Sequence, residues 1–239
     1  MRAVILAFLA GLLGAAPARA AEAPLVVVEL FTSQGCSSCP PADSYLGELA
    51  RRPDVLALAF HVDYWNYIGW TDPFASKLAS QRQRDYAKHL NLRYVYTPQM
   101  VINGASEGVG SERSTIGMLI KAAGEEKAPR QPVVLTRNPG GKISVHIDAG
   151  QTKEPATIWL IGYDGEHTTQ VLRGENGGQT LRDYQVVRNC ESLGAWRGEA
   201  MDIAVDASQA AGTDGIAVLL QLGGGGGRII GAATLKPMS

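Results

Sequence analysis

The chain has 239 residues, of which 45% are hydrophobic and 19% are charged, so it can build a sizeable core in one or two domains. Its 22 basic and 23 acidic side chains give a formal net charge of −1. Because neither sign dominates, the composition argues against a protein that binds nucleic acid or an anionic membrane through a basic patch.

The N-terminal residues have the pattern of a secretory signal peptide. Arg2 gives a positive start, residues 3–14 form an apolar run, and an A-x-A cleavage pattern ends at Ala20. The run is shorter than the roughly 20 residues that span a bilayer as a helix. We therefore expect residues 1–20 to be removed and the mature chain to be periplasmic or secreted, without membrane insertion. An uncleaved anchor is the alternative.

A strand, a helix and a second strand follow in the spacing of a βαβ unit. Residues 25–31 and 55–62 are apolar runs that predict buried strands, and residues 42–51 have a helical pattern. Such a unit joins two parallel strands by a right-handed crossover. Cys36 and Cys39, with two serines between them, lie between the first strand and the helix. The sequence therefore predicts a cysteine pair at a strand-to-helix turn.

The next elements are indicated by residues that begin helices or form turns. Asp72-Pro73 is typical of a helix start, with Asp72 as N-cap. Asn103-Gly104 predicts a hairpin turn. The expected elements are a helix from Asp72 to about Leu90, a strand over residues 99–102 and a helix over residues 112–123.

Residues 124–132 are charged, contain two prolines and predict a linker. Beyond them, apolar runs separated by glycine-rich turns favour an antiparallel β-sandwich. The strand candidates are residues 133–135, 143–147, 157–163, 185–187, 201–205, 216–222 and 228–235. We expect the five glycines at 223–227 to form a hairpin tip. A phosphate-binding loop is the alternative, although no Lys-Ser/Thr pair follows them.

A cysteine pair at a helix N-terminus has a defined redox chemistry. The free N–H groups and the helix macrodipole favour a thiolate on the first cysteine, and the second can resolve a mixed disulfide. We therefore expect Cys36 to be the exposed attacking thiol and Cys39 the resolving thiol. In an oxidising compartment their disulfide can persist. Cys190 is expected to be a lone buried thiol, with a third redox thiol as the alternative.

The order of elements around the cysteines resembles that of thioredoxin-like proteins, and the resemblance adds three site residues. In those proteins a cis-proline faces the dithiol and offers backbone groups to an extended substrate. The resemblance gives this role to Pro98, with Thr97 before it. It also implies a buried acid that relays a proton, for which Glu29 in the first strand is the candidate. A structural pairing of Glu29 is the alternative.

Four longer strings resemble one family of exported bacterial proteins. They are VVVELFTSQGCSSCPPAD, FHVDYWNYIGWTDPF, YTPQMVING and LRGENGGQTLRDYQVVR. They are similar to exported thioredoxin-like proteins catalogued as a domain of unknown function, and the resemblance spans residues 25–235. It implies the thioredoxin-like fold and export, and no particular substrate. The absence of a tryptophan before Cys36 and the long spacing from Cys36 to Pro98 argue against a general reductase.

The surroundings of the dithiol leave further alternatives open. Trp65 and Trp70, in an aromatic loop, form either a wall of a substrate groove or the core of an insertion. His61, on a predicted buried strand, is expected to be a satisfied core histidine. The polar run of residues 173–179 is expected to be a turn-rich loop, and packing over the dithiol is the alternative.

Together these observations predict an α/β thioredoxin-like domain over residues 24–125, with a central mixed sheet flanked by helices, and a β-sandwich-like domain over residues 130–239. The predicted function is thiol–disulfide exchange with the thiols and disulfides of exported proteins and with a redox partner protein, without a cofactor. One alternative is a non-enzymatic binding or scaffold protein whose disulfide is structural. The other is a copper(I) carrier in which His61 or His89 assists the two thiolates. We predict no metal site, because a closed zinc site usually needs four ligands and no second Cys-x-x-Cys is present.

Overall fold

The computed structural model describes residues 24–128, 130–210 and 214–235. The predicted signal peptide, residues 1–20, lies outside the described residues, so its cleavage stays a prediction. Among the described residues, no helix combines the length and the apolar character needed to cross a lipid bilayer.

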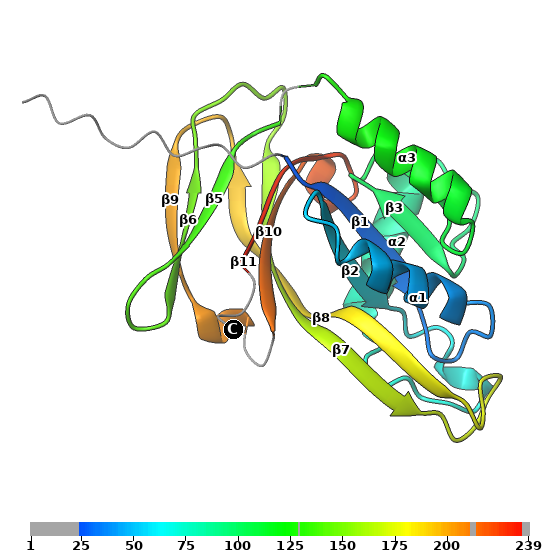
Figure 1. Cartoon of the computed structure of the whole chain (residues 1–239). Coiled ribbons are helices and arrows are strands. Elements are labelled where there is room, and N and C mark those ends of the chain that lie inside the picture. Colours follow the sequence, from blue (N-terminus) through cyan, green and yellow to red (C-terminus); the bar gives the residue numbers. More distant parts are fainter. Residues whose placement is uncertain (1–23, 129, 211–213, 236–239) are drawn as a thin grey trace, which may run out of the picture.

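A mixed sheet of eight strands runs through the molecule (Figure 1). Its strands, in spatial order, are β11 (Ile229–Leu235), β10 (Gly215–Gln221), β7 (Ala156–Gln170), β8 (Thr180–Trp196), β2 (Val55–His61), β1 (Val26–Thr32), β3 (Gln99–Ile102) and β4 (Ser106–Val109). β2 runs parallel to both of its neighbours, β1 and β8, and the other pairs are antiparallel. The chain is therefore a mixed α/β protein with a large mixed sheet. Strands from both sides of the predicted linker belong to this sheet, and β8 joins β2 through the pair Ala59 and Val186.

A second sheet covers the C-terminal part of the first. It contains β5 (Val133–Arg137), β6 (Lys142–Ile147) and β9 (Met201–Asp206), which pair in antiparallel fashion. Apolar side chains of this sheet, including Ile143 and Val145, pack with Ile158 of β7 and Val218 of β10. A separate core thus fills the space between the two sheets.

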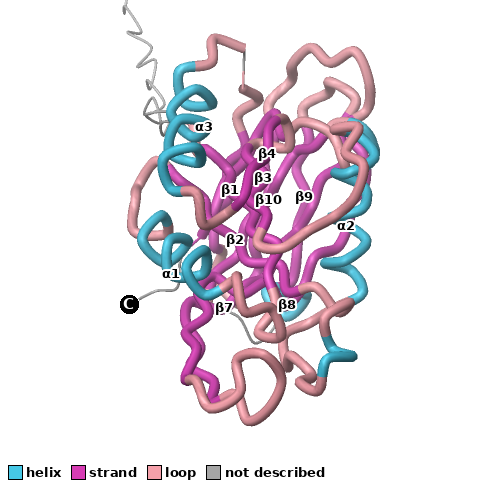
Figure 2. Tube along the Cα trace, turned by 90° about the vertical axis from the view of Figure 1, so that its right-hand side faces the viewer, coloured by secondary structure: helices cyan, strands magenta, loops and turns pink. Residues whose placement is uncertain are grey.

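Three helices cover the N-terminal part of the large sheet. They are α1 (Pro40–Leu49), α2 (Lys77–His89) and α3 (Arg113–Glu125). α1 and α3 lie on one face and α2 on the other (Figure 2). Because alternate side chains of a strand point to opposite faces, Val28 and Leu30 pack with α1 and α3, whereas Val27 and Phe31 pack on the α2 side. All seven residues of β1 and of β2 are buried, which explains their continuous apolar runs.

The structure corrects the predicted start of α2. The sequence predicts a helix from Asp72, but α2 begins later, and Ser76 caps it by accepting a 3.1 Å hydrogen bond from the N–H of Ala79. Asp72 caps only a single turn, in which its Oδ1 accepts the N–H of Phe74 at 2.9 Å, and the extended Ser76 separates this turn from α2. Asp72 also accepts the N–H of Gln34 and pairs with His61.

β7 and β8 extend far beyond the strands predicted at residues 157–163 and 185–187. They have 15 and 17 residues, and their pairing continues as far as Gln170 with Thr180. Past the large sheet they form a two-stranded ribbon that runs beneath α1 in Figure 1. We call the loop at its end, residues 171–179, the tip loop.

Two predicted turns pack against each other. Asn103-Gly104 joins β3 to β4, and both residues have positive φ, 48° and 63°, as this type of hairpin turn requires. The five-glycine segment joins the antiparallel strands β10 and β11, as predicted. A side chain on Gly104 would lie 2.2 Å from the carbonyl oxygen of Gly227, so the contact between the turns needs a glycine at this position.

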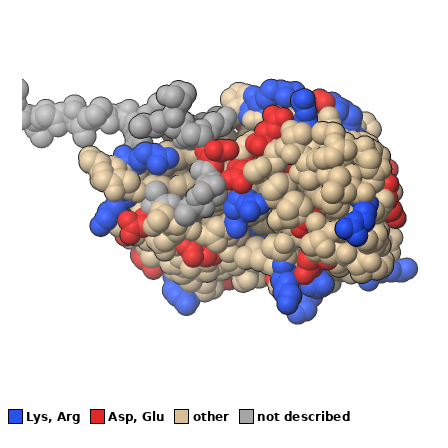
Figure 3. Space-filling model, turned by 90° about the horizontal axis from the view of Figure 1, so that it is seen from below, with Lys and Arg blue, Asp and Glu red and all other residues tan. Residues whose placement is uncertain are grey.

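Charged side chains of both signs are distributed over the surface. On the face shown in Figure 3 they are interspersed among uncharged side chains, in keeping with the formal net charge of −1. Among the described residues, two groups of buried charges adjoin the large sheet near the helices, apart from Asp164 of β7. One is the pair of Glu29 and Arg82, and the other is a cluster around His61.

Candidate functional site

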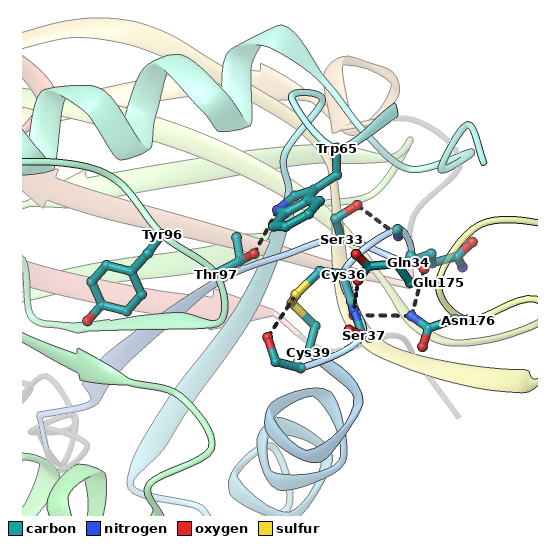
Figure 4. Close-up of a disulfide and its surroundings, with 12 residues drawn as sticks. Ser33, Gln34, Cys36, Ser37, Cys39, Trp65, Tyr96, Thr97, Glu175 and Asn176 are labelled. Atoms are coloured by element: carbon teal, nitrogen blue, oxygen red, sulfur yellow. Dashed lines mark hydrogen bonds between the residues drawn. A yellow bond between two sulfur atoms is a disulfide. The ribbon is translucent and has the colours of Figure 1, made fainter. Parts of the chain in front are cut away.

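The Cys36–Cys39 disulfide lies at the turn between β1 and α1, where the sequence predicts the pair (Figure 4). The Cα atoms of the two cysteines are 5.5 Å apart. Cys39 is the N-cap residue of α1, and prolines occupy the first turn of the helix, where their missing N–H groups leave no helical bond unmade. The turn is held by two backbone bonds, from the N–H of Cys36 to Ser33 (3.1 Å) and from the N–H of Cys39 to Cys36 (3.2 Å).

Both cysteines are buried, so the expectation of an exposed Cys36 is wrong. The exposed fraction is 1% for Cys36 and 0% for Cys39, whereas Ser37 and Ser38 are exposed. The aromatic loop around Trp65 and the tip loop both contact the turn that carries Cys36. The Ser38 hydroxyl lies 3.3 Å from the Cys36 sulfur, within hydrogen-bonding distance.

The Thr97-Pro98 peptide bond is cis, as the resemblance implies. Trp65 connects this segment to the dithiol turn. Its Nε1 donates a 2.8 Å hydrogen bond to the Thr97 hydroxyl, and its Cβ lies 3.2 Å from the place that a side chain on Gly35 would take. Figure 4 shows the indole and Thr97 on the same side of the disulfide. The structure therefore brings Trp65 and Thr97 together beside the two sulfurs.

The tip loop packs over the dithiol turn, which is the alternative that the sequence leaves open for residues 173–179. Asn176 is 1% exposed, and its Nδ2 donates to the carbonyl oxygens of Gln34 (2.9 Å) and Cys36 (3.1 Å). Glu175 accepts the N–H of Ser37 at 3.0 Å. Trp70 supports this arrangement, because its Nε1 donates to Gln34 Oε1 at 3.0 Å.

A buried cluster of charged side chains adjoins the turn, and the sequence analysis did not identify it. His61 Nδ1 is 2.7 Å from Asp72 Oδ2, and its Nε2 is 3.9 Å from Asp183 Oδ1. Gln34 ties the cluster to the turn, because its N–H donates to Asp72 (2.8 Å) and its Nε2 donates to Asp183 (2.7 Å). The expectation of a satisfied core histidine holds only in part, because His61 is buried and its Nδ1 is bonded to Asp72, but its buried Nε2 has no hydrogen-bond partner among the described residues. The sequence marked Asp72 only as a helix N-cap and gave no signal for Asp183, because the cluster joins residues that are distant in the sequence.

Asp43 is the fourth charged member of the cluster. It lies one helical turn after Cys39 on α1, and its N–H donates to the Cys39 carbonyl at 3.1 Å. Burial, together with the charge of Asp183, raises the pKa of Asp43 to about 7. Burial alone would lower the pKa of His61, but Asp72 and the other carboxylates raise it to about 9. Near neutral pH the cluster therefore holds a protonated imidazole and a carboxyl group close to its titration midpoint.

Glu29 lies on the opposite face of the sheet from α1. It accepts a 2.7 Å hydrogen bond from Arg82 Nε and another from the hydroxyl of Tyr86, both on α2. The Arg82 guanidinium also lies 5.3 Å from the centre of the Phe60 ring. These contacts support the structural alternative for Glu29. Asp43, on α1 itself, is one of three buried carboxyl groups in the cluster around His61, with Asp72 and Asp183.

The other candidates lie apart from this arrangement. Cys190 is free, and it packs in the same core cluster as Ile161 and Tyr163. Burial raises the pKa of Cys190 to about 11, as expected for an unreactive thiol. His89 ends α2 and lies near Gly223. Within the part of the chain that the structure describes, no group of three or more His, Cys, Asp or Glu side chains is placed to hold a metal ion.

The fold and the site define a mixed α/β protein that carries a Cys-x-x-Cys disulfide at a strand-to-helix turn of a large sheet. Residues 27–221 match the family described as "Protein of unknown function (DUF1223)", and the chain belongs to this family. No curated protein matches the chain.

Two solved structures are similar to this one. The first is the X-ray crystal structure of an Agrobacterium tumefaciens protein from a structural genomics consortium, which is 35% identical, with a TM-score of 0.80 over 91% of this chain and 96% of that one. The second is HBP35 of Porphyromonas gingivalis, with a TM-score of 0.61, 14% identity and coverage of 90% of this chain and 75% of that one. At this lower identity the likeness shows the fold alone.

We predict that Asp43→Asn changes how stability depends on pH. The folded protein holds a proton on Asp43 up to a pKa of about 7, whereas the unfolded chain releases it near 3.8. The free energy of unfolding of the wild type therefore falls as pH rises from about 4 through 7. Asparagine mimics the protonated form, so the variant gains stability relative to the wild type over that range. Urea unfolding at a series of pH values measures the difference.

The exposed Asp206 provides the matched control for this substitution. Asp206→Asn should follow the wild-type pH dependence. An Asp43→Asn difference that stays constant from pH 4 to 8 would contradict the raised pKa of Asp43.

We also predict that Glu29→Ala destabilises the fold by about 3–5 kcal/mol, because it leaves the buried Arg82 without its counter-charge. The double variant Glu29→Leu/Arg82→Met should recover much of this loss, since neither charge then remains buried. Asp54→Ala, which breaks the exposed pair with Arg52, should cost only about 0–1 kcal/mol. Urea unfolding followed by circular dichroism compares the three, and equal small losses would contradict a structural role for Glu29.

Proposed function

We propose that the chain is an exported thiol–disulfide oxidoreductase with a thioredoxin-like unit over residues 24–125. The observation that carries this proposal is the Cys36–Cys39 disulfide at the N-terminus of α1, with Thr97 of the cis Thr97-Pro98 segment bonded to Trp65 beside it. A helix N-terminus favours a thiolate on the first cysteine. The packing of β5, β6 and β9 over β7, β10 and β11 supports a β-sandwich-like unit after it.

The exchange proceeds through a mixed disulfide. The Cys36 thiolate attacks a disulfide of the substrate, bonds to one sulfur and releases the other as a thiolate. Cys39 then loses its proton and attacks the Cys36 sulfur, which closes the resident disulfide and releases the second substrate sulfur. The substrate gains two electrons and two protons, and the cysteine pair loses both. The reverse sequence oxidises the substrate.

We assign the proton relay to Asp43 in place of Glu29. Asp43 follows Cys39 by one turn of the same helix, it is buried, and its pKa is raised to about 7. A group whose pKa lies near the working pH is suited to accept and return a proton. Thr97 and Pro98 are assigned to the positioning of an extended substrate segment, with Trp65 beside them.

The partners follow from the proposed location. The leader pattern that ends at Ala20 supports export to the periplasm or the exterior, where disulfides persist. The substrates would be exported proteins with thiols or disulfides, and a redox partner protein would restore the pair after each turnover.

The burial of both cysteines favours one alternative, a binding or scaffold protein with a structural disulfide. The reduction potential of the pair separates the two functions. We predict a potential above about −300 mV for an exchanging pair, whereas structural disulfides of secreted proteins typically lie below that value. Equilibration of residues 21–239 with defined dithiothreitol and glutathione buffers gives the potential.

Cysteine variants add a second readout to this measurement. Cys39→Ser should accumulate mixed disulfides with exported proteins, because the resolving thiol is missing, and Cys36→Ser should accumulate none. Cys190→Ser, which changes a buried thiol away from the pair, is the control and should behave as the wild type. A potential below about −300 mV with no trapped partner would exclude exchange.

A further inference from the structure

Glu175 occupies a backbone donor next to Cys36. Its Oε2 accepts the N–H of Ser37, one residue after Cys36, at 3.0 Å (Figure 4). Free N–H groups at a helix N-terminus stabilise a thiolate. A carboxylate on the same N–H competes with the thiolate for this bond and repels its charge.

The dithiol turn has few other donors. Prolines fill the first two positions of α1 and have no N–H. The N–H of Cys39 donates to the Cys36 carbonyl, and the two N–H groups after the prolines donate to the Cys39 carbonyl. Among the donors of the turn itself, those left for a Cys36 thiolate are the N–H groups of Ser37 and Ser38 and the Ser38 hydroxyl, which is 3.3 Å from the sulfur. Glu175 takes one of these donors.

The backbone on both sides fixes the position of Glu175. On one side, the buried Asn176 donates to the carbonyls of Gln34 and Cys36. On the other side, Gly174 has a φ of +78°, and a side chain there would meet the Cβ of Trp70 at 3.2 Å. The conformation of the tip loop therefore holds Glu175 next to the turn.

The remaining charges near the dithiol add to this effect. The cluster next to the turn contains one imidazole and three carboxyl groups, those of His61, Asp43, Asp72 and Asp183. On the cis-proline side, the Tyr96 hydroxyl bonds to Glu107. Arg173 and Glu175 are both exposed to solvent, where charges are screened, but Glu175 is bonded directly to the Ser37 N–H. Around Cys36 the acidic groups therefore outnumber the cationic ones.

We propose that Glu175 is a positioning residue that lowers the reduction potential of the Cys36–Cys39 pair and thereby biases it toward the disulfide. This inference rests on the proposed function and gives it a direction. The reduced pair donates two electrons and two protons to a disulfide of an exported protein, and the resident disulfide forms again. A protein dithiol of lower potential then supplies two electrons and two protons to restore the reduced pair.

The test compares two charge-removing variants of the mature chain. Glu175→Gln keeps an oxygen that accepts the Ser37 N–H and removes only the charge. Glu166→Gln is the matched control, because Glu166 is an exposed residue of the same ribbon. The potential is measured by equilibration with dithiothreitol buffers, in which reduced dithiothreitol supplies the electrons and protons and becomes a cyclic disulfide. The pKa of the Cys36 thiol is measured by thiolate absorbance on the reduced protein.

We expect Glu175→Gln to shift the equilibrium with dithiothreitol about two- to fivefold toward the dithiol, the effect of a charge at a helix terminus. We also expect it to lower the pKa of Cys36, and both changes should shrink at high salt. A role of Glu175 limited to holding the loop would leave both quantities unchanged, because glutamine preserves the hydrogen bond. Glu166→Gln should match the wild type.

Two outcomes would overturn the inference. Either Glu175→Gln has the potential of the wild type, or Glu166→Gln shifts it equally, which would assign the effect to net charge. Failure of the proposed function is a separate result, in which the wild type does not exchange with a protein disulfide. The potentials of the variants are measured with dithiothreitol in either case, so the two failures are distinguishable.

Discussion

Gln34 engages all of its polar groups, and the position of the dithiol turn depends on them. Its N–H donates to Asp72, and its carbonyl oxygen accepts from Asn176. Its side chain donates to Asp183 and accepts from Trp70. A buried polar group without a partner costs about 1–3 kcal/mol, so each partner is needed once the others are in place. Cys36 follows two residues later and has little freedom to move independently of this network.

The hydrogen bonds of Gln34 connect the two halves of the chain. Two of the partners of Gln34 come from the N-terminal half, while Asp183 and Asn176 come from the β7–β8 ribbon and the tip loop. The unusual length of β7 and β8 is what brings them to the turn. The dithiol site is therefore completed by C-terminal strands, and the burial of both cysteines is a direct result.

The sequence predicted the features that depend on local spacing. The cysteine pair at the end of β1 and the Asn103-Gly104 turn follow from residues next to one another. The start of α2 was predicted wrongly, because the turn that Asp72 caps ends at the extended Ser76, while the other carboxylate oxygen of Asp72 is bound to Gln34 and His61. The pairing of β8 with β2 was not predictable either, because it rests on one residue pair in a strand with many exposed polar side chains.

Which acidic residue lies on the α1 side of the sheet, Glu29 or Asp43, also depends on contacts between distant parts of the chain. Alternation along β1 shows that Glu29 and Val28 face opposite sides, but it does not show which side α1 covers. Asp43, in turn, looks like any acidic residue in the first turn of a helix. Its burial becomes visible only when His61 and the ribbon are placed against it.

The size of the disulfide loop bears on what the disulfide is for. In the chain-entropy account, a disulfide stabilises by restricting the unfolded chain, and the gain grows with the loop that it closes. Cys36 and Cys39 are separated by three positions, so the gain is about 2 kcal/mol, against about 4.7 kcal/mol for a 100-residue loop. The turn is also held by Gln34 and Asn176. The stabilisation by this disulfide is thus less than half of what a long loop would give, and its place at the start of α1, with an acidic residue on the adjacent N–H, is the arrangement on which the proposed exchange rests.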